Sequence, residues 1–255
     1  MSDVVLEARG LVKRFGHVTA LDGADFTVRA DEVVALVGDN GAGKSTLIKT
    51  LSGVHAPTAG EIYFKGETVR LTSPIHAREL GIETVYQDLA LAPDLEPAAN
   101  LFLGRELVRP GVLGRLGFLD KAEMRRRTDE AFETLGVALR SGGEAVATLS
   151  GGQRQGVAVS RAVTWASEVV FMDEPTAALG VVQTRAVLDL IRKVKASGRS
   201  VVLVSHNMPE VFEVADRIEV LRLGRRVAQL DAADSSMEDV IGAMTGALAA
   251  AGANG

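Results

Sequence analysis

The stretch "GDNGAGKST", Gly38 to Thr46, has the residue types and spacing of a phosphate-holding loop. Its glycines let the backbone curl, so that successive N–H groups point at phosphate oxygens beside a helix start. Lys44 can then reach the β and γ phosphates of a nucleotide, while the Ser45 hydroxyl ligates Mg²⁺. The predicted nucleotide-binding residues are Gly38, Asp39, Asn40, Gly41, Ala42, Gly43, Lys44, Ser45 and Thr46.

A second stretch, "VVFMDEP", ends an apolar run with the two carboxylates of Asp173 and Glu174. Such a pair suits a magnesium site opposite the phosphate loop, with Asp173 toward the metal and Glu174 as the base toward an attacking water. Acidic pairs also cap helices or begin loops. The phosphate loop in the same chain favours the catalytic interpretation.

A third stretch, "ATLSGGQRQ", combines a capping pattern with two glycines. Ser150 and Gln153 have the S-x-x-Q spacing of a capping box, which predicts that a helix begins here. Gly151 and Gly152 leave the first N–H groups of that helix sterically bare, which is typical of an anion site. The alternative is a plain glycine-rich helix cap. This stretch lies on a predicted inserted lobe, away from the chain's own phosphate loop.

The elements around these stretches follow an α/β order. Residues 3–37 predict strands, and the continuous apolar run "VVALV" before Gly38 predicts a strand buried on both faces. From about Gln87 to Ala162, prolines, glycines and a helical segment, Lys121 to Leu135, indicate an inserted helical lobe. Strand and helix patterns then alternate through "EVVFMDEP", Val181 to Ala196 and "SVVLVSH", with a short helix near Pro209.

The composition excludes several classes of protein. The 255 residues are 47% hydrophobic, enough for one large domain, yet no apolar run reaches the roughly 18–20 residues that cross a bilayer. There is no cysteine and no secretory leader pattern, so we expect a cytoplasmic location. The net charge of -5 argues against binding to nucleic acid, and we expect "RRR", Arg125 to Arg127, to lie on a solvated helix face.

Taken together, these stretches resemble the nucleotide-binding domain of ATP-binding cassette (ABC) transporters, whose signature sequence reads LSGGQ as Leu149 to Gln153 do here. The resemblance covers nearly the whole chain and keeps the family's order of motifs: Walker A, Q-loop, signature, Walker B, D-loop and His switch. It implies a P-loop NTPase fold of class α/β, with a mostly parallel core sheet, an antiparallel N-terminal β subdomain and an inserted helical subdomain. The implied domain spans residues 1–245, with the helical subdomain at about 88–162 and a flexible tail at 246–255.

The resemblance also implies roles for single residues. In this family two domains face head to tail, so Ser150, Gly151, Gly152 and Gln153 would serve the γ-phosphate bound to a partner domain. Gln87 in "TVYQDLAL" resembles the Q-loop glutamine that senses Mg²⁺ and water, and its loop would touch the membrane subunit. The implied catalytic residues are Glu174, His206 and Gln87, and the implied metal ligands are Ser45, Gln87 and Asp173.

Two positions need separate comment. Phe15 in "LVKRFGHVTAL" matches the aromatic residue that stacks on adenine in the family, and a core position in a strand is its alternative. The family usually has S-A-L-D after the Walker B Glu-Pro-Thr, whereas this chain has "AALG", Ala177 to Gly180. Gly180 thus replaces a carboxylate that normally links the two composite sites, which puts tight coupling between them in doubt.

Longer stretches, such as "FMDEPTAALG" and "SHNMPEVFEVADRIEVLRLGRRV", resemble the ATP subunits of bacterial monosaccharide importers. Many of those subunits carry two fused cassettes, and this chain has one, so we expect it to pair with a second copy. The resemblance implies an ATPase with ATP and Mg²⁺, on the cytoplasmic face of the membrane. Its partners would be a transmembrane permease and, indirectly, a sugar-binding receptor.

Other functions stay open. The chain could serve an importer of another small solute. It could be a non-transport ABC ATPase, although such proteins usually insert coiled coils or zinc hooks, which the sequence does not suggest. It could also be a degenerate cassette that binds ATP without turnover, for which Gly180 is the only support.

Overall fold

The central sheet is built around the run Val33–Val37, all five residues of which are buried. Such a strand is covered on both faces, as a continuous apolar run predicts. In the computed structural model, which describes residues 4–139, 143–177 and 179–247, this strand lies inside a six-stranded sheet of order β10-β9-β3-β8-β7-β6. All neighbours in this sheet are parallel except β10, which pairs antiparallel with β9.

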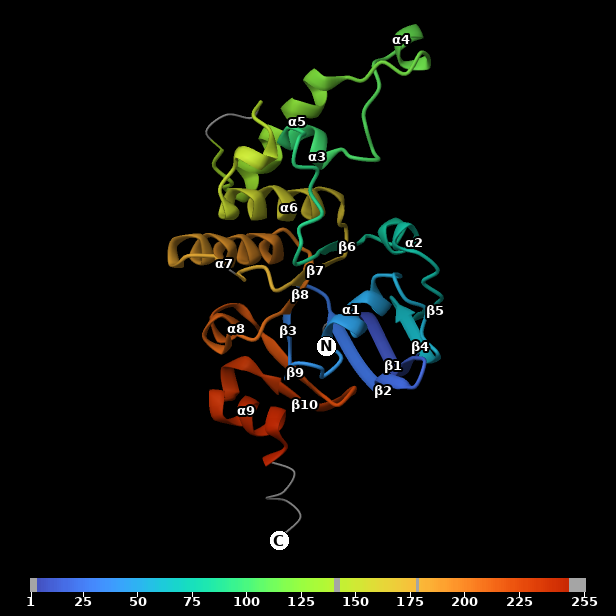
Figure 1. Ribbon diagram of the computed structural model, residues 1–255, viewed down its shortest axis with the longest axis vertical. Coiled ribbons are helices and arrows are strands. Elements are labelled where there is room, and N and C mark those ends of the chain that lie inside the picture. The colour runs from blue at the N-terminus through green and yellow to red at the C-terminus, as the bar shows by residue number, and fades with distance from the viewer. Residues whose placement is uncertain (1–3, 140–142, 178, 248–255) are drawn as a thin grey trace.

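A second sheet of four antiparallel strands, β2-β1-β4-β5, packs against the first (Figure 1). The strands of both sheets are β1 (Val4–Phe15), β2 (Val18–Arg29), β3 (Val33–Val37), β4 (Ala59–Phe64), β5 (Glu67–Val69), β6 (Ile82–Val85), β7 (Val169–Asp173), β8 (Ser200–Val204), β9 (Arg217–Arg222) and β10 (Arg225–Asp231).

The helices are α1 (Lys44–Leu51), α2 (Pro74–Glu79), α3 (Pro97–Leu101), α4 (Val112–Arg115), α5 (Lys121–Leu135), α6 (Gly151–Trp165), α7 (Val181–Ala196), α8 (Met208–Val214) and α9 (Met237–Thr245), with 3₁₀ turns at Val146–Thr148 and Ala232–Asp234. Within the described residues, no helix is long and apolar enough to cross a membrane.

The apolar core falls into layers on either side of the central sheet. One cluster fills the space between the two sheets and includes α1, and a second packs α6 and α7 on the opposite face. A third cluster holds α8 and α9 on β3 and β9. Because both faces of β3, β7 and β8 are covered, the loops at their carboxyl ends are held in fixed positions.

The helices α3 to α6 follow β6 and precede β7, and they form a lobe at one end of the molecule (Figure 1). This lobe has its own apolar cluster, which includes Phe102, Met124, Phe132 and Val157. On α5, the arginines at 125, 126 and 127 are exposed and paired with glutamates, so the expected solvated face is confirmed.

The predicted fold class is confirmed: a mostly parallel core sheet, an antiparallel N-terminal sheet and an inserted group of helices. The predicted helices Lys121 to Leu135 and Val181 to Ala196 have these same bounds in the structure. The bounds of the helical subdomain, about 88–162, stay a prediction. Most of the predicted tail, residues 248–255, and residue Ala178 of the "AALG" stretch lie outside the described residues.

Candidate nucleotide-binding site

The phosphate loop needs glycine at both ends because the backbone passes close to its neighbours. A Cβ on Gly38 would lie 2.1 Å from the carbonyl oxygen of Leu221, and one on Gly43 would lie 2.6 Å from that of Ala20. Both residues also have positive φ, 152° and 105°, which favours glycine. The loop therefore lies tightly between β2 and β9, directly before α1. Its shape is set by this packing.

Lys44 is folded back onto the loop from which it projects. Its Nζ donates to the carbonyl oxygen of Gly38 at 2.6 Å and to that of Asp39 at 3.1 Å. Burial lowers the pKa of this ammonium, and the nearby carboxylates, Glu174 foremost, oppose the shift. A phosphate would offer Lys44 a full negative charge in place of these neutral carbonyl groups.

A pocket of about 370 Å³ opens in front of the loop. It is lined by residues 40–46 and by the start of β2, Val18, Thr19 and Ala20. Val18 is 65% exposed and pairs across the hairpin with Phe15. The pocket thus combines a helix N-terminus with an apolar edge, which suits phosphates and a nucleobase together. Sequence patterns did not single out Val18.

Phe15 lies at this apolar edge, not in the core. Its ring is 43% exposed, with the ring of His55 in edge contact at a centroid distance of 5.2 Å. The ammonium of Lys13 lies 5.1 Å from the ring centroid. Of the two interpretations of Phe15, the structure excludes the core strand position.

Ser45, Gln87 and Asp173 line a second pocket, of about 780 Å³, although they come from α1, the loop after β6 and the end of β7. Their side chains offer oxygen ligands, the kind that Mg²⁺ prefers. Burial, and next the charge of Glu174, raise the pKa of Asp173, and a cation bound here would oppose both effects because it favours the ionised carboxylate. The residues present therefore fit a magnesium ion.

Glu174 lies directly after β7 in a constrained conformation. Its φ is 50°, uncommon for a residue with a side chain, and its N–H donates to the carbonyl oxygen of Val204 at 3.0 Å. Its Oε2 lies 2.9 Å from Nδ1 of His206, which follows the neighbouring strand β8. The ends of β7 and β8 thus bring these two predicted catalytic residues into contact. Such strain at a strand end often marks a functional site.

The loop that carries Gln87 is tied to α6. Leu89 and Ala90 both have positive φ, 58° and 44°. Their carbonyl oxygens accept hydrogen bonds from the guanidinium of Arg161, at 3.0 and 2.8 Å. The helix α6 begins at the SGGQ stretch and carries Arg161, so this arginine connects that helix to the loop of Gln87. Sequence analysis missed Arg161, which no motif singled out.

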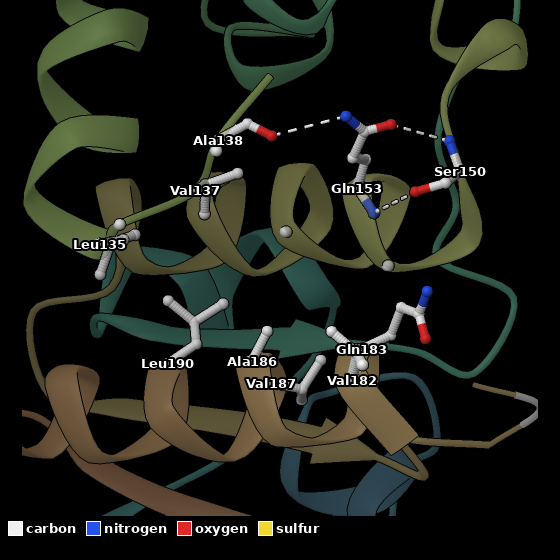
Figure 2. A pocket seen from close by; sticks show the side chains of 13 residues that line it. Leu135, Val137, Ala138, Ser150, Gln153, Val182, Gln183, Ala186, Val187 and Leu190 are labelled. Carbon is white, nitrogen blue, oxygen red and sulfur yellow. Dashed lines mark hydrogen bonds between the residues drawn. The ribbon is translucent and has the colours of Figure 1, made fainter. Parts of the chain in front are cut away.

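The predicted capping box at Ser150 is present. Ser150 Oγ accepts from the N–H of Gln153 at 3.3 Å, and Gln153 Oε1 accepts from the N–H of Ser150 at 3.0 Å (Figure 2). Gln153 Nε2 also donates to the carbonyl oxygen of Ala138 at 3.5 Å. The side chain of Gln153 thus holds the helix start against the chain segment that follows α5.

The two glycines of this helix start have different surroundings. A Cβ on Gly152 would lie 2.7 Å from Cγ of Gln183, on α7, whereas one on Gly151 would make only an ordinary 3.4 Å contact with Leu179. Gly152 therefore lets α6 and α7 approach closely, a packing role that sequence analysis did not consider. Gly151 leaves its side of the helix start accessible.

The SGGQ stretch does not join the pockets of the phosphate loop. Ser150, Gly152 and Gln153 line a separate pocket of about 250 Å³ between α6 and α7 (Figure 2), and neither Ser45 nor Lys44 lines it. In Figure 1, the start of α6 lies in the helical lobe, while α1 lies beside β3 and the antiparallel sheet. One chain thus brings together Lys44, Ser45, Gln87, Asp173, Glu174 and His206, but not the SGGQ stretch.

Glu210 links the two loops that follow β7 and β8. One carboxylate oxygen accepts from Thr176 Oγ1 at 2.5 Å, and the other accepts from Asn207 Nδ2 at 2.7 Å. The chain after Glu174 and the chain after His206 are therefore joined through one carboxylate. Sequence analysis also missed this residue. Gly180, which stands where the resemblance noted above has a D-loop carboxylate, lies directly before α7 as its N-cap residue.

The comparison with protein families matches residues 21–177 to the family described as "ABC transporter". The chain is 54% identical over 245 residues to the fructose import ATP-binding protein FrcA of Rhizobium meliloti, covering 95% of this chain and 94% of that protein. It is 46% identical to the xylose/arabinose import ATP-binding protein XylG of Sulfolobus acidocaldarius, over 96% and 95% of the two chains.

A ribose import ATP-binding protein of Rubrobacter xylanophilus is 42% identical, and the chain spans about half, 47%, of its length. Among solved structures, an ATP-binding cassette of an ABC transporter in its ADP conformation superposes with a TM-score of 0.77, at 25% identity and 95% coverage of both chains. A dimeric bacterial ABC transporter cassette superposes with a TM-score of 0.74 over 89% of this chain, at 23% identity.

Proposed function

The chain belongs to the ABC transporter family, and on that premise we propose that it is the ATP-hydrolysing subunit of a monosaccharide importer. The observation that carries the hydrolytic part is the contact between Glu174 and His206 beside a phosphate loop in which Lys44 is half-buried. Relatives named for the import of fructose and of xylose/arabinose, which match over almost their whole length, support the sugar part.

Lys44 and the start of α1 hold the phosphates in this proposal. The first N–H groups of a helix have no partner within the helix, and α1 has no side-chain cap at Gly43. They can donate to the β and γ phosphates, while Lys44 exchanges the carbonyl oxygens of Gly38 and Asp39 for phosphate oxygens. Phe15 stacks on the adenine at the outer edge of the same pocket.

Ser45, Gln87 and Asp173 are the residues that would hold Mg²⁺, which neutralises charge on the phosphates during transfer. Glu174, one residue beyond Asp173, faces the same region and accepts a proton from the attacking water. His206 contacts Glu174 through Nδ1, so it can orient this carboxylate or exchange it for the γ-phosphate when nucleotide is present.

The SGGQ helix start completes the site of a second copy. It lies apart from the chain's own phosphate loop, yet the start of α6 carries bare N–H groups at Gly151. Two copies that face head to tail would place these groups against each other's γ-phosphate. ATP would then favour the closed dimer because ADP lacks the bridging phosphate. Hydrolysis would release the closed state.

Force would pass to the permease through the loop of Gln87. This loop lies between the magnesium site and α6, and Arg161 ties it to that helix. A shift of Gln87 on loss of the γ-phosphate would therefore move the helical lobe. The sugar itself would bind the permease and a receptor, not this chain, which acts as a peripheral subunit on the cytoplasmic face of the membrane.

The substitution Glu174→Gln tests this assignment. It keeps the shape of the side chain but removes the base, so we expect ATP turnover to fall by about 100-fold or more while ATP still binds. An ATP-bound dimer should accumulate, measured by size-exclusion chromatography with Mg²⁺. The matched control is Glu213→Gln, a half-exposed carboxylate on α8 paired with Arg192, which should leave turnover unchanged. Normal hydrolysis by Glu174→Gln would show that Glu174 is not the base.

The sugar part has its own test. The chain should be reconstituted with a permease and a receptor that co-purify with it, and transport of radiolabelled pentoses and hexoses measured with ATP. We expect uptake of a monosaccharide that depends on ATP and is lost with Glu174→Gln. Uptake of another class of solute would refute monosaccharide import and leave the ATPase assignment standing.

A further inference from the structure

A protruding segment of the helical lobe exposes an unusual amount of apolar surface. This segment, residues 107–119, is called the projection here, and it leaves the body between α3 and α5 with α4 at its tip (Figure 1). It is not part of either pocket near the phosphate loop. Neither nucleotide binding nor the contact between α6 and α7 uses it.

Leu107 packs against the apolar cluster of the helical lobe, whereas the other large apolar side chains of the projection face solvent. Val112 is 72% exposed, Leu116 68% and Phe118 55%. Val108, Leu113 and Leu119 are also exposed large apolar residues. Single exposed apolar residues are common on protein surfaces, but a contiguous group of this kind marks an interaction site.

The projection has a defined shape that holds these side chains outward. Val108 and Leu119 form an antiparallel bridge, and the N–H of Arg109 donates to the carbonyl oxygen of Phe118 at 2.9 Å. A Cβ on Gly114 would lie 1.9 Å from the carbonyl oxygen of Arg109, so the tip requires a glycine there. The backbone thus folds on itself and cannot bury the apolar side chains in its own core.

The charge of the projection is opposite to that of the chain. Residues 107–119 contain two arginines, Arg109 and Arg115, and no acidic residue, whereas the whole chain carries a net charge of -5. Within the described part of the chain, neither arginine side chain forms a salt bridge. The flanking acids are engaged locally: Glu106 accepts from the N–H of Gly104, and Asp120 caps α5.

We propose that the projection inserts its apolar tip into the interfacial region of an anionic lipid bilayer, with Arg109 and Arg115 at the headgroups. Apolar side chains flanked by cations are the composition of segments that lie in a membrane interface. A protruding tip suits insertion between headgroups better than packing on a flat protein face. Anionic lipids attract each arginine near the surface, whereas the cytoplasmic loops of membrane proteins are rich in Lys and Arg and would repel them.

The inference rests on the proposed function only for the location of the chain beside a membrane. Its physical consequence is orientation. A lipid contact at the tip of the helical lobe would hold that lobe against the bilayer while the two sheets hydrolyse ATP. The contact would add to the affinity for a permease without new protein contacts, because it limits the search to the membrane surface.

The test uses the full chain and protein-free vesicles. We expect it to co-sediment with vesicles of phosphatidylcholine containing phosphatidylglycerol, and to bind at least tenfold more weakly to phosphatidylcholine alone. Binding should weaken in 1 M salt, where the Debye length is about 3 Å. The double substitution Leu116→Ser with Phe118→Ser should lower the partition coefficient by about tenfold for each side chain removed. Arg109→Gln with Arg115→Gln should lower it by roughly fivefold for each charge.

The matched control is Ile75→Ser with Val227→Ser, which removes two exposed apolar side chains outside the projection, 65% and 47% exposed. This control should bind vesicles like the parent chain. Thermal melting checks that each variant is folded. Because the chain contains no cysteine, Leu116→Cys accepts a single environment-sensitive fluorophore, whose emission should shift to the blue with anionic vesicles.

Three outcomes would overturn the proposal: no binding to anionic vesicles, undiminished binding by the folded tip variant, or binding only when the permease is present. The last would identify the projection as a protein-docking segment. A tip variant that loses self-association while the parent ignores vesicles would assign the projection to a second copy. ATP hydrolysis in solution is measured separately and should not change in the tip variant, so a failure of the proposed function can be told apart.

Discussion

At the scale of single residues, Gly151 and Gly152 illustrate how two adjacent identical residues acquire different roles. A side chain at Gly152 would collide with Gln183 of α7, whereas one at Gly151 would make an ordinary contact with Leu179. The first glycine therefore leaves its side of the helix start accessible, and the second lets α6 pack closely on α7. The sequence motif alone presents them as equivalent.

The matched pair Gly151→Leu and Gly152→Leu separates these roles. We expect Gly151→Leu to abolish ATP hydrolysis, because the side chain would block the bare N–H groups offered to a partner, with little change in the free energy of unfolding. Gly152→Leu should lower that free energy by about 1–3 kcal/mol through overpacking. Urea unfolding and ATP binding to the monomer are the measurements. A loss of monomer ATP affinity in Gly151→Leu would mean that the stretch serves its own chain's nucleotide.

At the scale of elements, the site depends on how α6 and the strand ends are connected. The loop with Gln87 is neither helix nor strand, and its residues Leu89 and Ala90 have left-handed backbone conformations. The guanidinium of Arg161 donates to the carbonyl oxygens of both residues, so these hydrogen bonds attach the loop to α6. In the proposed mechanism this loop senses nucleotide, and the hydrogen bonds from Arg161 would carry its motion to the helical lobe.

Arg161→Met should therefore loosen the loop without emptying the nucleotide pocket. Hydrogen bonds to charged groups contribute about 1.5–3 kcal/mol, so amide exchange in residues 87–91 should accelerate about tenfold or more. We expect ATP hydrolysis to fall by roughly tenfold, because Gln87 is no longer held in position, with ATP affinity unchanged. Hydrogen exchange by mass spectrometry checks the first effect. Arg127→Met, an exposed change on α5, is the control; equal exchange in both variants would rule out a tie through Arg161.

At the scale of the whole molecule, a buried ionic group joins the two sheets. Arg217 on β9 is 2% exposed, and its guanidinium donates to Glu32 at 2.6 Å and to the carbonyl oxygen of Thr27, on β2, at 2.5 Å. It also contacts the buried carboxylate of Glu219. The antiparallel sheet, which carries Phe15, is thus fixed to the six-stranded sheet, whose strands β7 and β8 precede the predicted catalytic residues Glu174 and His206.

Arg217→Met should lower the free energy of unfolding by about 3–5 kcal/mol, because it leaves two carboxylates without their buried partner. Arg225→Met is the matched control: this exposed arginine also reaches β2, through Asp22, and such pairs contribute about 0–1 kcal/mol. Urea denaturation of both variants measures the difference. Equal losses would contradict a special role for the buried arginine.

The whole-molecule view also explains why one chain is half of the proposed machine. The phosphate pocket and the SGGQ helix start are built from different elements, and they line different pockets. Pairing of two copies is the arrangement that brings both to one nucleotide. The projection at residues 107–119 would add a second external contact, with lipid, at the far end of the helical lobe.

The sequence by itself determined the fold class, the limits of several elements and the place of the glycine loop between a buried strand and a helix. Val33–Val37 is a continuous apolar run, and Lys121–Leu135 and Val181–Ala196 are periodic; such patterns depend on local periodicity, which a sequence displays directly. The capping box at Ser150 is equally local, because its partners are three residues apart. The roles of the predicted site residues stay predictions that the experiments above can test.

Only the tertiary structure decided which residues share a pocket and what holds them there. Ser45, Gln87 and Asp173 meet because parallel strands end at one edge of the sheet, and Arg161, Glu210 and Arg217 act on partners distant in the sequence. Gly152 allows α7 to pack closely against α6, although β7 separates these two helices in the sequence. The physical reason is that side-chain contacts across elements depend on distances that no sequence pattern of a single element encodes.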